Sequence, residues 1–152
     1  MISDRSLQEL IWAIQMSEGQ FSLILARCNY LPLQKQIGER LHKLPSLQIQ
    51  KVFLDTSVNK LYSTIQKQLK EEQPSAVMVF GLESVKDIER LIISANQVRE
   101  EFRKNFHFPL VLWVTDEISS KLIRLAPDLE SWTTSIYFPC TQRAPICGVV
   151  KP

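Results

Sequence analysis

Apolar residues alternate between two patterns along the chain. In the first pattern, short segments are mostly apolar, least so at residues 49–54, which predicts strands. These segments are residues 21–26, 49–54, 76–80, 109–114 and 135–138. In the second pattern, apolar positions recur at i, i+3, i+4 and i+7, as on one face of a helix. The expected helices span residues 4–17, 32–44, 58–69, 84–102 and about 116–127.

The alternation of strands and helices predicts an α/β fold. Helical crossovers between strands favour a parallel sheet covered on both sides, which is a three-layer α/β/α arrangement. Residues 76–80 and 110–114 have no polar side, so we expect them to be the most buried strands. We expect one domain over residues 1–138. Residues 139–152 hold three prolines and no periodic pattern, which predicts an irregular C-terminal tail.

Composition excludes several classes of protein. The 152 residues are 45% hydrophobic and 22% charged, as in ordinary soluble chains. The net charge is only +2 and no basic stripe is visible, so we expect no nucleic-acid partner. No apolar stretch approaches the ~20 residues of a membrane span. A signal-peptide pattern is absent and the three cysteines are widely spaced. We therefore expect a cytoplasmic protein that does not contact membranes.

Glycine usage separates the chain from standard nucleotide-binding domains. The four glycines are Gly19, Gly38, Gly81 and Gly148, and no Gly-Lys dipeptide occurs. A Walker A loop needs two glycines five positions apart followed by Lys, and a dinucleotide fingerprint needs three glycines within six positions. Neither phosphate-binding motif is present.

Polar residues that follow the strands define the candidate site. Ligands of parallel sheets bind outside the carboxyl ends of the strands. The expected crevice therefore contains Asn29, Gly81, Glu83, Thr115 and Asp116.

Two interpretations of the polar residues at this edge compete. Several acids without a basic phosphate ligand could indicate Mg²⁺. Helix capping is the favoured interpretation, because the polar residues precede expected helices. This set comprises Asp55, Thr56, Ser84, Thr115 and Asp116. We therefore predict no metal site and no catalytic residue here.

Cys28 also follows a strand and precedes a helix, where the pKa of a thiol can fall. His42 and His107, the two histidines of the chain, lie away from this edge. Without a base nearby, the favoured role of Cys28 is that of a small buried side chain. The three tryptophans, Trp12, Trp113 and Trp132, are expected in the core or at its edge.

Four segments resemble those of a known group of proteins. Residues 76–83 (AVMVFGLE) resemble a Walker-B-type strand with an acid at its tip. Residues 106–117 (FHFPLVLWVTDE) resemble the strand of AAA-type ATPases that carries a polar sensor residue. Residues 124–132 (RLAPDLESW) are similar to a stretch in bacterial multidomain proteins, and residues 21–29 look like their first strand and loop. Those proteins join an ATPase-like N-terminal segment to tetratricopeptide, WD40 or STAND-type NTPase regions.

The resemblance covers about residues 5–138 and implies a P-loop-NTPase-like sheet of order 5-1-4-3-2. Periodicity alone also permits the flavodoxin-like order 2-1-3-4-5. By resemblance, Glu83 stands where a Walker-B acid would, and Thr115 or Asp116 stands near the sensor position. The phosphate loop would fall on residues 26–33, which contain no Gly, Lys, Ser or Thr. Side chains throughout that loop would obstruct the backbone approach that phosphates need.

Three functions follow as expectations. The first is a non-catalytic, ATPase-derived interaction or regulatory module, the N-terminal part of a larger signalling or scaffold protein, with a protein partner and no cofactor. The second is a domain that binds a nucleotide or small ligand at the strand-end crevice without hydrolysis. The third is an unrecognised enzyme, such as a hydrolase.

Overall fold

The computed structural model describes residues 4–70 and 72–139, and these ranges form one five-stranded parallel sheet. The strand order is β2-β3-β4-β1-β5, which confirms the predicted order 5-1-4-3-2. The register places Leu23 opposite Leu110, so β1 pairs with β4. The flavodoxin-like order is excluded because it would pair β1 with β3. The strands are β1 (Ser22–Arg27), β2 (Ile49–Phe53), β3 (Ala76–Phe80), β4 (Pro109–Val114) and β5 (Thr133–Tyr137).

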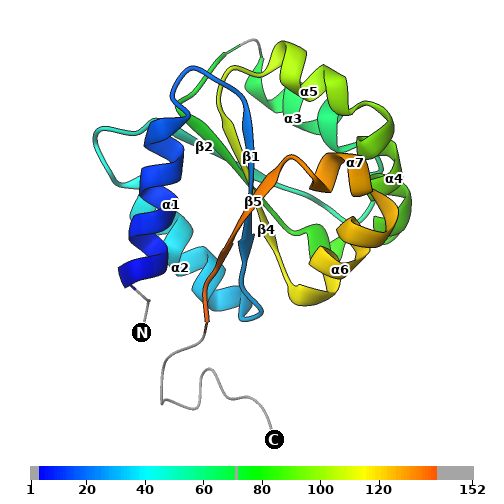
Figure 1. Ribbon diagram of the computed structural model, residues 1–152, viewed down its shortest axis with the longest axis horizontal. Helices are drawn as coiled ribbons and strands as arrows, with labels where there is room; N and C mark the ends of the chain where they lie inside the picture. Colours follow the sequence, from blue (N-terminus) through cyan, green and yellow to red (C-terminus); the bar gives the residue numbers. More distant parts are fainter. Residues whose placement is uncertain (1–3, 71, 140–152) are drawn as a thin grey trace, which may run out of the picture.

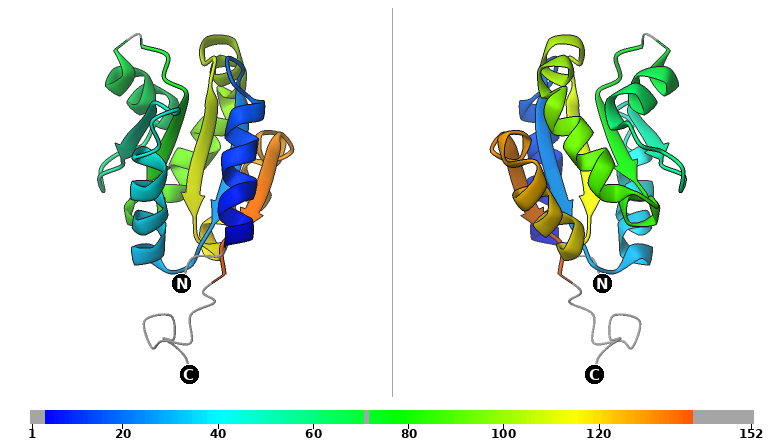
Figure 2. Two further views of the ribbon diagram at one scale, coloured as in Figure 1. Left: turned by 90° about the vertical axis from the view of Figure 1, so that its left-hand side faces the viewer. Right: turned by 90° about the vertical axis from the view of Figure 1, so that its right-hand side faces the viewer.

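Helices cover both faces of the sheet, which gives the expected three layers (Figure 1). One face carries α1 (Asp4–Met16) and α2 (Leu31–His42), which Figure 2 (left) shows in front of the sheet. The other face carries α3 (Leu61–Leu69), α4 (Ile88–Gln97), α5 (Arg99–Asn105), α6 (Asp116–Leu125) and α7 (Pro127–Glu130). A short 3₁₀ helix, η1 (Leu82–Ser84), follows β3. No helix within the described ranges is long and apolar enough to cross a bilayer.

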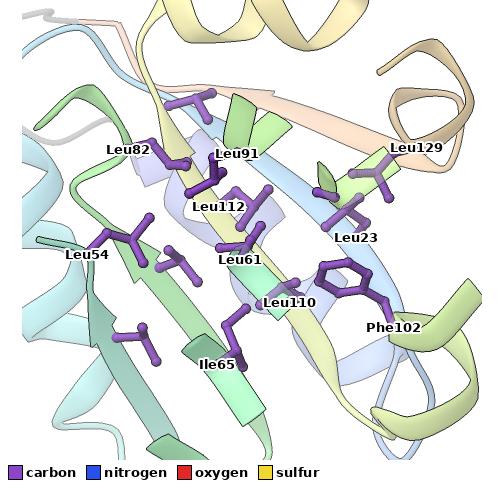
Figure 3. Close-up of a cluster of buried hydrophobic side chains, with 14 of the residues drawn as sticks. Leu23, Leu54, Leu61, Ile65, Leu82, Leu91, Phe102, Leu110, Leu112 and Leu129 are labelled. Atoms are coloured by element: carbon purple, nitrogen blue, oxygen red, sulfur yellow. The ribbon is translucent and has the colours of Figure 1, made fainter. Parts of the chain in front are cut away.

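Each face of the sheet has its own hydrophobic core. The larger core lies between the sheet and α3–α7, where Leu110 and Leu112 meet Leu61, Leu91 and Phe102 (Figure 3). The smaller core lies under α1 and α2 and includes Leu10, Ile37, Met78 and Trp113. Strands β3 and β4 are buried at every position, which confirms that they are central and two-sided.

Several predicted helix boundaries hold, but one predicted helix is two. Gly19 has φ +77° just beyond α1, and Pro32 lies in the first turn of α2. The helix predicted over residues 84–102 is wrong: α4 starts after Asp87, and the chain bends at Val98 before α5. At the bend, the Asn96 carbonyl accepts a hydrogen bond from the Arg99 guanidinium at 2.8 Å.

Candidate functional site

The carboxyl ends of β1 and β4 lie side by side and bring two segments of the predicted site together. Arg27 is opposite Val114, and the backbone N–H of Cys28 donates to the Val114 carbonyl at 2.9 Å. The pairing therefore continues one residue beyond β1. Asn29 lies two residues beyond β1 and Asp116 two residues beyond β4, and their side chains are in direct contact.

Asn29 and Asp116 bind each other in both directions. The Asn29 side-chain amide donates to Asp116 Oδ2 at 2.9 Å, and the backbone N–H of Asp116 donates to Asn29 Oδ1 at 2.8 Å. Arg27 Nη2 donates to Asp116 Oδ1 at 3.1 Å. Together, the hydrogen bond from Asn29 and the charge and hydrogen bond of Arg27 hold the pKa of Asp116 below its usual value. The Asp116 carboxylate is thus ionised and engaged on both of its oxygens.

Arg27 is engaged on its other side as well. Its guanidinium carbon lies 5.0 Å from the centre of the Tyr137 ring, which is a cation–π contact. The Arg27 carbonyl accepts from the backbone N–H of Phe138 at 2.8 Å, just beyond β5. The cation at the end of β1 therefore links β4 and β5 rather than facing an open loop.

The segment between β1 and α2 is closed by its own hydrogen bonds. Cys28 is buried, and its thiol donates to the Tyr30 carbonyl at 3.4 Å. The buried Gln34 side chain donates to the Cys28 carbonyl at 2.8 Å. Burial raises the pKa of the Cys28 thiol, so the neutral form dominates near neutral pH. The prediction of a small buried side chain is confirmed.

Gly81 and Glu83 lie at the same edge of the sheet, beyond β3. Gly81 has φ +95°, and its carbonyl accepts from the Ser84 N–H at 2.9 Å to form η1. Glu83 is an exposed residue of η1. In the described part of the chain, no hydrogen bond or ion pair joins either residue to Asn29 or Asp116. The five predicted residues therefore form two groups, one after β3 and one between β1 and β4.

The capping interpretation is correct at one end of this edge. The Thr115 hydroxyl accepts from the Ile118 N–H at 3.3 Å and caps α6, with Asp116 as the first helical residue. Ser84 does not cap α4, because it belongs to η1 and Asp87 caps α4.

The predicted caps at Asp55 and Thr56 are wrong. The Asp55 carboxylate accepts from the N–H and hydroxyl of Ser57 at 2.9 and 2.7 Å, which closes a turn. The Thr56 carbonyl accepts from the Lys86 N–H at 2.9 Å. This contact joins the loop after β2 to the loop after η1. Helix α3 begins at Leu61, so neither Asp55 nor Thr56 is next to its first turn.

Other features of the surface were not expected from the sequence. A hollow of about 560 Å³ lies at the amino edge of the sheet and is lined by His42, Gln48, Glu72 and neighbouring residues. A smaller hollow of about 200 Å³ lies between α2 and β2. Trp12 was expected in or beside the core, but it is 63% exposed on the outer side of α1. These features depend on how distant segments meet, and periodicity carries no signal for them.

Metal chemistry has no cluster of ligands to support it in the described ranges. No group of three or more His, Cys, Asp or Glu residues there is close enough to hold a metal ion. The predicted acids at the carboxyl edge instead bind their own neighbours, as Asp55 does with Ser57 and Asp116 does with Asn29.

No family model matches the chain, and a search of curated proteins found no match.

Proposed function

We propose that this chain is a non-catalytic interaction or regulatory module derived from an ATPase-like fold, and that it works through a protein partner. The observation that supports this most is the mutual pairing of Asn29 and Asp116. The pair occupies the edge where a phosphate loop would be needed in a P-loop-like sheet.

The contacts at this edge leave few groups for a phosphate. Proteins with such sheets bind the phosphates of a nucleotide through the N–H groups of a glycine loop, a lysine, and a Ser or Thr hydroxyl that ligates Mg²⁺. In this chain the backbone N–H of Asp116 donates to the Asn29 side chain, and the Arg27 guanidinium donates to the Asp116 carboxylate. The Thr115 hydroxyl accepts from the backbone of α6.

Hydrolysis can be tested with the purified chain. We expect no release of phosphate from ATP or GTP with Mg²⁺, and no thermal shift with either nucleotide at 1 mM. A ligand at 100 times its Kd adds about 2.7 kcal/mol to stability, so binding with a Kd near 10 μM would be visible.

The Glu83→Gln variant is the matched comparison, because Glu83 stands where a Walker-B acid would. Turnover in the wild type that disappears in Glu83→Gln would overturn the proposal and establish an unconventional active site. A thermal shift without turnover would favour the other function considered, a ligand-binding domain that uses the strand-end edge.

A further inference from the structure

The free margin of the sheet at β2 presents unpaired backbone groups. Strand β2 pairs only with β3 in the described sheet. The Gln48 carbonyl accepts from Ser75 and Ala76, and the Leu54 N–H donates to Phe80, so the even-numbered residues here face β3. Because backbone groups alternate along a strand, the N–H and C=O groups of Ile49, Lys51 and Phe53 face outward.

The same margin carries an exposed aromatic ring. Phe53 is 55% exposed, and its ring stacks on buried Phe80 with centroids 5.1 Å apart. The two rings line the hollow of about 200 Å³ with Lys35, Glu39 and Lys51. A side chain on an added strand would reach this ring, because strands lie about 4.8 Å apart.

The charge beside the exposed ring is net positive, because Lys35 and Lys51 line its hollow with one acid, Glu39. A second hollow of about 390 Å³, on the outer side of α2, is lined by Lys35, Gln36, Glu39 and Arg40. Glu39 is paired with Lys51 at 2.7 Å, and this contact holds the pKa of Glu39 below its usual value. Neither Lys35 nor Arg40 forms an ion pair with another residue in the described part of the chain.

We propose that the β2 margin binds an acidic, extended peptide segment of a partner protein as an added sixth strand. This inference rests on the proposed function and names the class of partner. On the side of the sheet that faces α2, the segment places an aliphatic residue against Phe53. An acidic residue two positions away faces Lys35, because side chains on one face of a strand recur every second residue.

Charge argues against a second copy of this chain as the occupant. A two-fold pairing of β2 with itself would bring together two margins of net positive charge, because Lys35 and Lys51 outnumber Glu39 at each of them, and like charges across paired strands are destabilising. Lysine on an edge strand often blocks pairing. Here the Lys51 ammonium is turned onto Glu39, and its side chain is only 19% exposed.

The probe is a labelled eight-residue peptide, Thr-Glu-Thr-Ile-Thr-Glu-Thr-Ile, which places Glu and Ile alternately on one face. We expect it to bind the whole chain and to shift the amide resonances of residues 49–53 in ¹H–¹⁵N spectra. A peptide with Lys in place of Glu is the charge control, and we expect at least tenfold weaker binding. Equal binding of the two peptides, or no shifts at residues 49–53 with 1 mM acidic peptide, overturns the inference.

Two pairs of variants separate the backbone from the charge. Lys51→Pro removes an outward N–H, whereas Lys51→Ala removes the same charge and keeps that N–H. We expect Lys51→Pro to bind the acidic peptide about tenfold more weakly than Lys51→Ala, the factor for one hydrogen bond. Lys35→Glu should weaken binding several-fold, while Lys104→Glu on α5 makes the same change of net charge and should not. Equal affinities within the first pair contradict the added strand, and equal affinities within the second pair contradict an acidic partner.

Light scattering and the nucleotide assay complete the test. If the wild type is a dimer and Lys51→Pro is a monomer, β2 pairs with a second copy of the chain, and the inference of an acidic partner is wrong. If the wild-type chain neither binds the acidic peptide nor hydrolyses a nucleotide, the binding site at β2 is refuted and the proposed function is not. Turnover that depends on Glu83 refutes the proposed function itself.

Discussion

Gly81 offers a direct test of the close approach between the ends of β2 and β3. Its φ is +95°, and a Cβ built on it would lie 2.9 Å from the Leu54 carbonyl oxygen. Leu54 is held to β3 by a 2.9 Å hydrogen bond from its N–H to the Phe80 carbonyl. Alanine at position 81 must therefore adopt an unfavourable φ and also push against the backbone at the end of β2.

Gly19 supplies the control, because its φ is also positive (+77°) and a Cβ there would meet nothing within 4 Å. The left-handed backbone costs an L-residue about 1–2 kcal/mol. Loss of freedom in the unfolded chain returns about 0.4–1 kcal/mol. We therefore expect Gly19→Ala to lower the free energy of unfolding by about 1 kcal/mol, and Gly81→Ala by about 3 kcal/mol, within the range for backbone strain and overpacking.

The assay is urea unfolding followed by far-UV circular dichroism, with slopes compared to confirm that the same surface is exposed on unfolding. If Gly81→Ala does not fold, Gly81→Asn and Gly19→Asn repeat the comparison with a residue that tolerates positive φ better. Free energies within about 0.5 kcal/mol of each other for the two alanine variants would refute the predicted contact with Leu54, since that is the usual limit of additivity.

Three further predictions concern the core and the carboxyl edge. Gly38→Ala would place a Cβ 2.7 Å from Cζ of buried Phe80, and it should lower the free energy of unfolding by about 1–2 kcal/mol; a stabilised variant would show that the ring gives way. Val79→Asp puts an unpaired carboxylate in a fully buried strand and should leave the chain unfolded or insoluble, so a cooperative urea transition would contradict the central place of β3. The folded-state pKa of Asp116 is lowered, so its stabilising contribution is present above the unfolded pKa of about 3.9 and is lost as pH falls through the folded-state value. Asp116→Asn should therefore show a smaller loss of stability than wild type when unfolding is followed from pH 5 to pH 2, and identical curves would contradict the contact with Asn29 and Arg27.

The order of the strands could be predicted, but not from periodicity. Alternating apolar patterns locate five strands and most helices, and they fit more than one strand order. Residues 76–83 and 106–117 favour the order 5-1-4-3-2, because they resemble neighbouring strands of ATPases. The pairing of β1 with β4 agrees with the order that this resemblance implies. The resemblance in function stays a prediction.

The contacts that define the edge were beyond prediction because they join distant parts of the chain. The strand pattern predicted that Asn29 and Asp116 would lie at the same edge of the sheet. It did not predict their direct hydrogen bonds, because the two residues are 87 positions apart. A second contact between distant residues lies beside the bend at Val98, where Asn96 Oδ1 accepts from the backbone N–H of Leu129 at 2.9 Å. A continuous helical pattern of apolar residues gives no sign of such a contact. Local sequence therefore predicted the elements and some of their ends, such as Gly19 beyond α1 and Thr115 before α6, but not the long-range polar contacts between them.

Substitution of Phe53 shows whether its exposed ring contributes mainly to binding at the β2 margin or to the stability of the fold. Phe80 lies beneath it and is 4% exposed, so Phe80→Ala should lower the free energy of unfolding by about 3–5 kcal/mol. Phe53 is half exposed, so Phe53→Ala forfeits part of an apolar burial and one ring stack, about 1–1.5 kcal/mol in total. Parallel urea titrations give both values, and the acidic peptide gives the affinity of the folded Phe53→Ala variant. We expect a small loss of stability and at least a fivefold loss of affinity in that variant. A Phe53→Ala variant as unstable as Phe80→Ala would make the exposed ring a structural part of the sheet, and the aromatic argument for an added strand would fall.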